Sequence, residues 1–143
     1  EGASNVFLLD TGGATIDTDG DGLPDWWETK YFGSATGAEA FDDWDSDGAS
    51  NDAECQAGTD PRSQTSVFWL HITPIDPDTG GGVNLSWSSA PGRRYEIWKA
   101  TDLNQVPTLL TPQILATPPV NSITDSSATN AVGFYRVTIV QNP

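Results

Sequence analysis

The second half of the chain alternates apolar and polar residues in short runs separated by proline, glycine and serine. A period of two is typical of antiparallel strands that bury one face. Six strands are predicted: Val67–Ile72, Val83–Trp87, Tyr95–Lys99, Thr108–Leu110, Val120–Ile123 and Phe134–Val140. Short strands with frequent turns favour an antiparallel β-sandwich over residues 66–143, and about 78 residues are enough for one such core.

The first half of the chain has a different pattern. Asn5–Asp10 is a short apolar run closed by the turn-forming residues 11–13, and it predicts a single strand with no partner nearby. Two short helices are predicted at Pro24–Phe32 and Ser50–Ala57, and Pro24 suits a helix start because its missing N–H costs nothing there. The predicted fold is mainly β, in three parts: residues 1–16, 17–63 and 66–143.

Two twelve-residue stretches, Asp17–Glu28 (DTDGDGLPDWWE) and Asp43–Glu54 (DWDSDGASNDAE), repeat one pattern. A calcium loop of this length uses side-chain oxygens at positions 1, 3, 5, 9 and 12 and a backbone carbonyl at position 7, with glycine at position 6. The first stretch supplies Asp17, Asp19, Asp21, the carbonyl of Leu23, Asp25 and Glu28, with Gly22 at the turn. The second supplies Asp43, Asp45, Asp47, the carbonyl of Ala49, Asn51 and Glu54, with Gly48 at the turn.

Oxygen ligands in this number favour Ca²⁺ over zinc or copper, and magnesium is a weaker rival because it needs a smaller octahedron. The alternative is a solvated acidic loop without an ion, but so many carboxylates in two short loops would repel one another. No helical pattern leads into either loop, so these are loop-then-helix units and not EF-hands. The aromatic residues Trp26, Trp27, Tyr31, Phe32 and Trp44 are expected to form the small core of this segment.

The charge balance bears on partners and location. The chain has 6 Lys and Arg against 20 Asp and Glu, a net charge of −14, and thirteen of the acids lie between Asp17 and Asp60. Such a surface argues against nucleic acid and against membrane insertion or binding to anionic lipid. The chain has no Met and starts at Glu1, which suggests a secreted protein after signal peptide removal. Weak calcium sites, with Kd of roughly 10⁻⁴ to 10⁻³ M, suit an extracellular location.

Enzymatic chemistry is not expected. The single Cys55 cannot form an internal disulfide and is expected to be a small packed residue, with an intermolecular disulfide as the alternative. His71 lies in an alternating apolar run, and neither residue has a recognisable nucleophile context. The carboxylates of the central segment are already assigned to calcium.

The loop segment resembles the bacterial thrombospondin type 3 repeat, through DTDGDGLPDWWE and the later AGTDP at Ala57–Pro61. In that family the aspartate of the Asp-Pro step tends to close a second calcium site. The resemblance therefore implies Asp60 for the second loop and Asp43 for the first, although Trp44 replaces the proline there. Dockerins carry cohesin-reading residues at positions 10 and 11, where this chain has residues 26–27 and 52–53, so cohesin docking is not expected.

Residues 81–100 resemble the second and third strands of a fibronectin type III-like sandwich, and GFYRVTI at 133–139 resembles its penultimate strand. That family has seven strands, and this sequence stops at Pro143. The resemblance predicts a missing last strand, which leaves an unpaired sheet edge.

An unpartnered strand and a missing strand together suggest strand donation, in which Asn5, Val6, Phe7, Leu8 and Leu9 complete the sandwich of a second copy. A head-to-tail contact of this kind builds a filament unless its rotation closes a ring. The first hypothesis is a secreted, calcium-stabilised structural protein that polymerises with itself. Two alternatives stay open: the strand pairs within its own chain, or the protein is a non-catalytic adhesion module of a larger secreted protein and binds a surface glycan or another protein.

Overall fold

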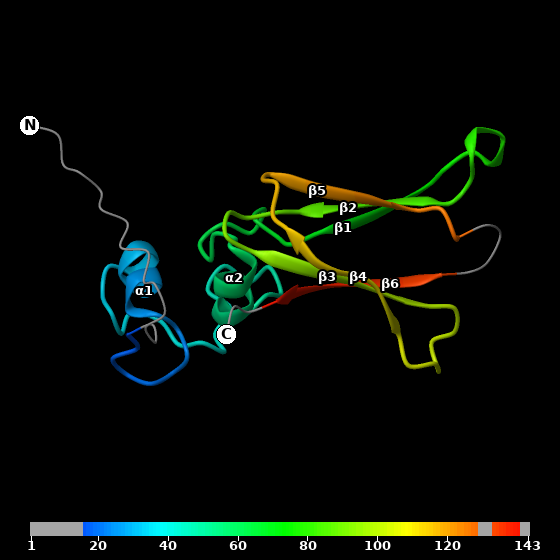
Figure 1. Cartoon of the computed structure of the whole chain (residues 1–143). Coiled ribbons are helices and arrows are strands. Elements are labelled where there is room, and N and C mark those ends of the chain that lie inside the picture. Colours follow the sequence, from blue (N-terminus) through cyan, green and yellow to red (C-terminus); the bar gives the residue numbers. More distant parts are fainter. Residues whose placement is uncertain (1–15, 129–132, 141–143) are drawn as a thin grey trace, which may run out of the picture.

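The computed structural model describes residues 16–128 and 133–140, so the strand predicted at Asn5–Asp10 lies outside the described residues. Within them the fold is mainly β, with two short helices ahead of the strands (Figure 1). The elements are α1 (Asp25–Phe32), α2 (Asn51–Ala57), β1 (Leu70–Pro74), the 3-10 helix Pro77–Thr79, β2 (Val83–Ser88), β3 (Arg94–Ala100), β4 (Thr108–Leu115), β5 (Val120–Asp125) and β6 (Phe134–Val140). Both predicted helices and all six predicted strands are confirmed as elements.

Capping residues stand at the start of α2 and at the end of both helices. Ser50 precedes α2 with extended backbone, and its hydroxyl accepts a hydrogen bond from the N–H of Ala53, which satisfies one of the free donors of the first turn. Gly33 ends α1 with φ 82° and Gly58 ends α2 with φ 78°. A left-handed residue after the last turn is a common helix stop, and glycine adopts it without a side-chain clash.

The strands form two three-stranded antiparallel sheets with the orders β1-β2-β5 and β4-β3-β6. β1 begins at Leu70, three residues later than predicted, because pairing with β2 starts where Leu70 lies opposite Trp87. β4 extends five residues beyond the prediction, through Pro112. Proline is tolerated there because β4 is an edge strand and does not need every N–H in the ladder.

The two sheets share one apolar core. Leu85 and Trp87 from β2 and Tyr95 and Ile97 from β3 are all 0% exposed. The rings of Trp87 and Tyr95 meet edge to face with centroids 5.7 Å apart, an arrangement that aromatic pairs favour. The alternation that predicted these strands therefore marks the face that each sheet turns toward the other.

A buried ion pair joins the two sheets at one end. The Nζ of Lys99 on β3 lies 2.6 Å from the carboxylate of Asp125 at the end of β5. Asp125 also accepts hydrogen bonds from the hydroxyls of Ser127 and Tyr135. Burial alone would raise the pKa of the Asp125 carboxyl, but these partners outweigh it and hold that pKa well below its usual range.

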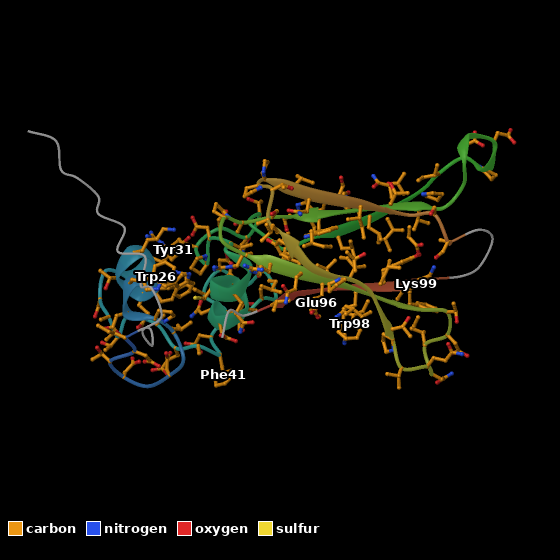
Figure 2. The ribbon with its side chains drawn as sticks, in the orientation of Figure 1. Trp26, Tyr31, Phe41, Glu96, Trp98 and Lys99 are labelled. Atoms are coloured by element: carbon orange, nitrogen blue, oxygen red, sulfur yellow. The ribbon has the colours of Figure 1, made fainter. Side chains whose placement is uncertain are left out.

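The calcium-loop segment has its own small core. Leu23 is 0%, Trp27 2% and Ala40 4% exposed, and half-buried Tyr31 and Phe32 pack against them. This confirms the predicted core role of Trp27. The same prediction is wrong for Trp26, which is 49% exposed (Figure 2), because Trp27 takes the inward face of this short helix, and for Trp44, which is 61% exposed.

One arginine connects that segment to the sheets. Arg93, in the turn before β3, donates from Nε to the carbonyl of Gln56 and from Nη2 to the carbonyl of Cys55, both at 2.7 Å. These carbonyls belong to the last turn of α2, where helix carbonyls lack partners within the helix. In Figure 1, α2 accordingly lies against the end of the sheets, and α1 lies farther out.

Candidate calcium site

The two repeats have the same backbone conformation. At position 4 of the loops, Gly20 has φ 77° and Ser46 has φ 65°; at position 6, Gly22 has φ 105° and Gly48 has φ 99°. These are left-handed values that favour glycine. The first aspartate of each loop binds the same two N–H groups, at positions 4 and 6. The sequence repeat is therefore also a structural repeat.

Three aspartates converge in each loop. Oxygen atoms from Asp17, Asp19 and Asp21 lie within 4.8 Å of one another, and the same holds for Asp43, Asp45 and Asp47. Three negative charges at such separations repel one another unless a cation lies among them. The structure thus brings together positions 1, 3 and 5 of both loops.

The glutamate at position 12 is buried in both repeats. Glu28 is 0% and Glu54 1% exposed. One oxygen of each has a hydrogen bond: Glu28 accepts from the N–H of Ala38 at 3.2 Å, and Glu54 accepts from the hydroxyl of Thr59 at 3.1 Å. The Oε2 atom of each glutamate is buried without any hydrogen-bond partner. A buried carboxylate oxygen without a partner is costly, and a bound cation would satisfy it.

Other predicted ligands of the second loop also have a buried oxygen without a hydrogen-bond partner. Among the described residues, seven buried side-chain atoms lack a hydrogen-bond partner, and five of them are oxygens at the predicted calcium positions. Besides the two glutamate oxygens they are Asp45 Oδ2, Asp47 Oδ2 and Asn51 Oδ1. Asn51 is oriented by its own amide, which donates to the carbonyl of Glu39 at 2.8 Å. This donor set consists of oxygen only, and it fits a calcium ion.

Two predicted ligands, Asp25 and Asp60, lie away from the groups of three aspartates. Both oxygens of Asp25 accept hydrogen bonds from Thr18, one from its N–H and one from its hydroxyl, each at 2.7 Å. Asp60 is exposed and accepts from the N–H of Arg62. Asp25 and Asp60 lie outside both aspartate groups, and Asp43 belongs to the second group only. At position 7, the N–H groups of Leu23 and Ala49 bind the carboxylate two residues earlier.

The linker between the loops contacts both of them, which the sequence did not predict. On one side, Ala40 donates its N–H to Asp21 Oδ2 at 2.7 Å, and Ala38 donates to Glu28. On the other side, the carbonyls of Ala40 and Asp42 accept the N–H groups of Asp52 and Asn51, the first residues of α2. The sequence signal for this close approach was the small size of residues such as Ala38 and Ala40. The contacts couple the order of one loop to the order of the other.

Burial raises the pKa of the Glu54 carboxyl to about 7, and the charges of the neighbouring Asp45 and Asp47 contribute to this increase. Burial likewise raises the pKa of Glu28, with a smaller contribution from Asp19 and Asp21. Both increases in pKa apply to the loops without a bound cation. A cation in the loop would oppose both shifts, because it favours the charged carboxylate.

We expect the calcium-free protein to lose stability as pH rises from about 4.5 to about 7. The folded Glu54 binds its proton more tightly than the unfolded chain does, so its contribution is present below pH 4.5 and is lost as pH passes its folded pKa of about 7. A shift of this size corresponds to about 3 kcal/mol. Urea unfolding in calcium-depleted buffer, without a chelator whose affinity changes with pH, measures it. Glu54→Gln serves as control and should show a smaller slope; equal slopes would refute the assignment to Glu54.

Comparison with known protein families agrees with this geometry. Residues 17–34 and 43–62 match the family model Bacterial TSP3 repeat, one match over each loop with its helix. Searches of curated proteins and of solved structures gave no match. Two segments of the chain are therefore similar to this repeat, a calcium-binding type that is typical of extracellular proteins.

Two further residues can be placed. Burial raises the pKa of the Cys55 thiol to about 11, so this thiol is protonated and unreactive near neutral pH. His71 stacks on Trp69 with ring centroids 4.5 Å apart. Over residues 16–128 and 133–140, neither helix is long and apolar enough to span a bilayer.

Proposed function

We propose that this protein is a secreted, calcium-stabilised structural protein, the subunit of an extracellular filament or surface assembly. The observation that carries the calcium part is the set of five buried oxygens without hydrogen-bond partners, all at repeat positions 3, 5, 9 and 12. Such a set is unfavourable in the folded chain alone and becomes favourable around a divalent cation.

In this proposal calcium acts mechanically. The ions would be held by the aspartates at positions 1, 3 and 5 and by Glu28 and Glu54, with Asn51 contributing in the second loop and further ligands from Asp25, Leu23, Ala49 and Asp60. Bound calcium neutralises the carboxylates and fixes each loop to its helix. Because Arg93 ties the end of α2 to the sheets, ordering of the second loop also fixes where the sheets begin.

The assembly part rests on the sheets. We infer that they form a fibronectin type III-like sandwich in which, among the described residues, one sheet edge takes a strand from another copy; the strand orders β1-β2-β5 and β4-β3-β6 are in keeping with this. Immunoglobulin-type sandwiches of the smaller kind have seven strands, and the seventh pairs along the edge of one of the two sheets. Donation of residues Asn5, Val6, Phe7, Leu8 and Leu9 by a second copy would supply that strand and link copies head to tail.

Negative-stain microscopy of the full chain tests this proposal. We expect filaments in millimolar calcium, fraying of the filaments in excess chelator, and monomers when residues 1–10 are deleted. Chelation should act because loosening of residues 17–62 removes the rigid connection between the donor segment and the sheets. A variant that keeps the length but carries Phe7→Asp and Leu9→Asp, which removes the apolar character of the segment, should also be monomeric. Uniform small particles in both conditions would instead support a module that binds a glycan or another protein.

A further inference from the structure

We propose that the free edge of β6, together with the cavity at its start, is the acceptor site for the apolar segment Asn5–Leu9 of a second copy. This inference rests on the proposed function and deepens it by assigning the surface that receives the donated strand. The anchor of the segment is Phe7, its largest apolar side chain.

The first observation is the sheet edge. β6 pairs with β3 along its whole length, from Phe134 opposite Ala100 to Val140 opposite Arg94. In the part of the chain that the structure describes, no strand pairs with the other side of β6. This side presents a row of backbone groups suited to a further strand. Edge pairing of this kind is a common mode of strand recognition.

The second observation is that the core is incompletely covered along this edge. Ile97 and Tyr95 on β3 are 0% exposed, yet their partners on β6, Val137 and Ile139, are only half-buried. On the other sheet, Ile72 of β1 is 45% exposed although it pairs with Leu85, which is fully buried. Apolar side chains that belong to a core face but remain accessible indicate a place for another apolar segment.

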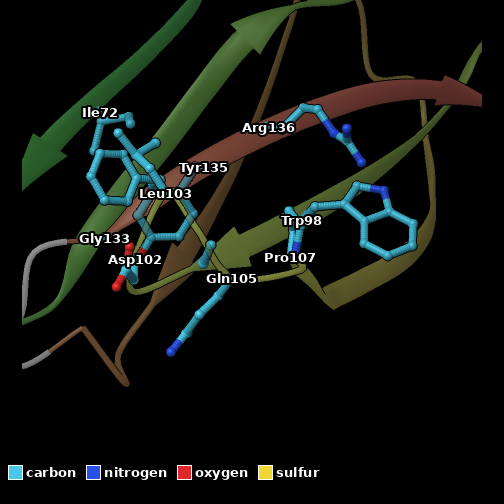
Figure 3. Close-up of a pocket in the computed structure, with 11 residues that line it drawn as sticks. Ile72, Trp98, Asp102, Leu103, Gln105, Pro107, Gly133, Tyr135 and Arg136 are labelled. Carbon is cyan, nitrogen blue, oxygen red and sulfur yellow. The ribbon is translucent and has the colours of Figure 1, made fainter.

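The third observation is a cavity of about 430 Å³ at the start of β6. Its walls come from β1, from the loop between β3 and β4 and from the start of β6 (Figure 3). Apolar contacts are available from Ile72, Leu103, Pro107 and Phe134. Its size and lining suit a large apolar side chain such as that of Phe7.

The position of this cavity favours a second copy over the same chain. Figure 1 places the first calcium loop at one end of the molecule and the start of β6 toward the other end. From Leu9 to Ile16 the chain spans at most about 25 Å when fully extended. The molecule's own segment would have to pass the second loop, α2 and the length of β6 before it reached the cavity. A neighbouring copy has no such constraint.

Charge gives an independent argument for a head-to-tail partner. Residues 17–62 carry thirteen of the chain's 20 acids. Four of the chain's six basic residues lie on or next to the sheet β4-β3-β6; Lys99 is paired with Asp125 and Arg93 donates to α2, so Arg94 and Arg136 are the two that can face an acidic partner. A donated strand brings the acidic loop segment of its own copy toward this sheet, and opposite charge favours that orientation over like ends meeting.

Disulfide trapping between two differently labelled full-length proteins tests the site. One protein carries Phe7→Cys and the other Leu103→Cys, a position that is 75% exposed in the cavity wall. In both proteins Cys55→Ser removes the native thiol, so that only the introduced cysteines can form a disulfide. The matched control replaces Leu103→Cys by Leu115→Cys, which is 61% exposed on the opposite edge strand β4. Leu9→Cys provides a second donor probe two residues farther along.

With calcium and a mild oxidant, we expect at least tenfold more mixed dimer with Leu103→Cys than with Leu115→Cys. Equal yields for both donor probes would overturn the acceptor site. A double variant Phe7→Cys and Leu103→Cys that gives mainly an intrachain disulfide would overturn the assignment to a second copy. If filaments require residues 1–10 but no excess of mixed dimer forms, the proposed function stands and this acceptor site is wrong.

Discussion

Removal of calcium is expected to unfold residues 17–62 before the two sheets and to lower the melting temperature by about 10–20 °C. An ion that binds only the folded state contributes about 2.7 kcal/mol per site at a hundredfold excess over Kd, and each kcal/mol corresponds to roughly 2–4 °C for a chain of this size. Removal of the ion also leaves the buried oxygens of Glu28 and Glu54 without partners, which further destabilises the loops. Calorimetry with calcium at a hundredfold excess over Kd, about 10–100 mM for the Kd range given above, and with chelator gives the shift, and hydrogen exchange shows which segment opens first.

A matched pair of variants makes this test specific. Glu54→Gln removes the charge at position 12 of the second loop, and Asp52→Asn removes the same charge from the same helix at a position outside the ligand pattern. Glu54→Gln should lose most of the calcium response of its loop while melting no lower than the parent in chelator, since a neutral amide is less costly to bury. Asp52→Asn should keep the response. Equal melting of the parent with and without chelator would contradict a stabilising role for calcium.

The second large effect is expected from Asp125→Ala, which should lower the free energy of unfolding by about 3–5 kcal/mol at pH 7. The side chain of Asp125 is 3% exposed and that of Lys99 17% exposed. Removing the carboxylate leaves a mostly buried ammonium without its ion pair and also leaves the hydroxyl of Tyr135 without its acceptor. Breaking a buried pair at one partner is costly because the other charge stays desolvated. Urea unfolding in millimolar calcium measures the loss.

Two controls separate this ion pair from general charge effects. Glu96→Ala removes a carboxylate from the same strand β3, on the outer face (Figure 2), and should change stability by less than about 1 kcal/mol. Asp125→Ala combined with Lys99→Met removes both charges and should recover part of the loss. Since the pKa of Asp125 is lowered by folding, its contribution is present above its ordinary pKa and declines as pH falls below it. A loss below 1 kcal/mol for Asp125→Ala would show that the pair does not stabilise the fold.

The sequence alone determined those features that depend on local spacing. The twelve-residue pattern places Asp17, Asp19 and Asp21 on one loop because a calcium loop needs carboxylates at alternate positions and a glycine at position 6. The same reasoning located the second loop and the two short helices. Alternation located six strands because a half-buried strand repeats every two residues. Each of these signals spans a dozen residues or fewer, so no knowledge of distant contacts is required.

The tertiary structure decided everything that joins residues far apart in the chain. Lys99 and Asp125 lie 26 residues apart, and no local pattern shows that two strands from different sheets end side by side. The bonds from Arg93 to α2 and from the linker to both loops are likewise long-range. Burial of Trp27 and exposure of Trp26, two adjacent and chemically identical residues, follow from which face of α1 meets the core. Local spacing determines which atoms can bind an ion or pair as a strand, but only packing determines which of them are buried, paired or left accessible.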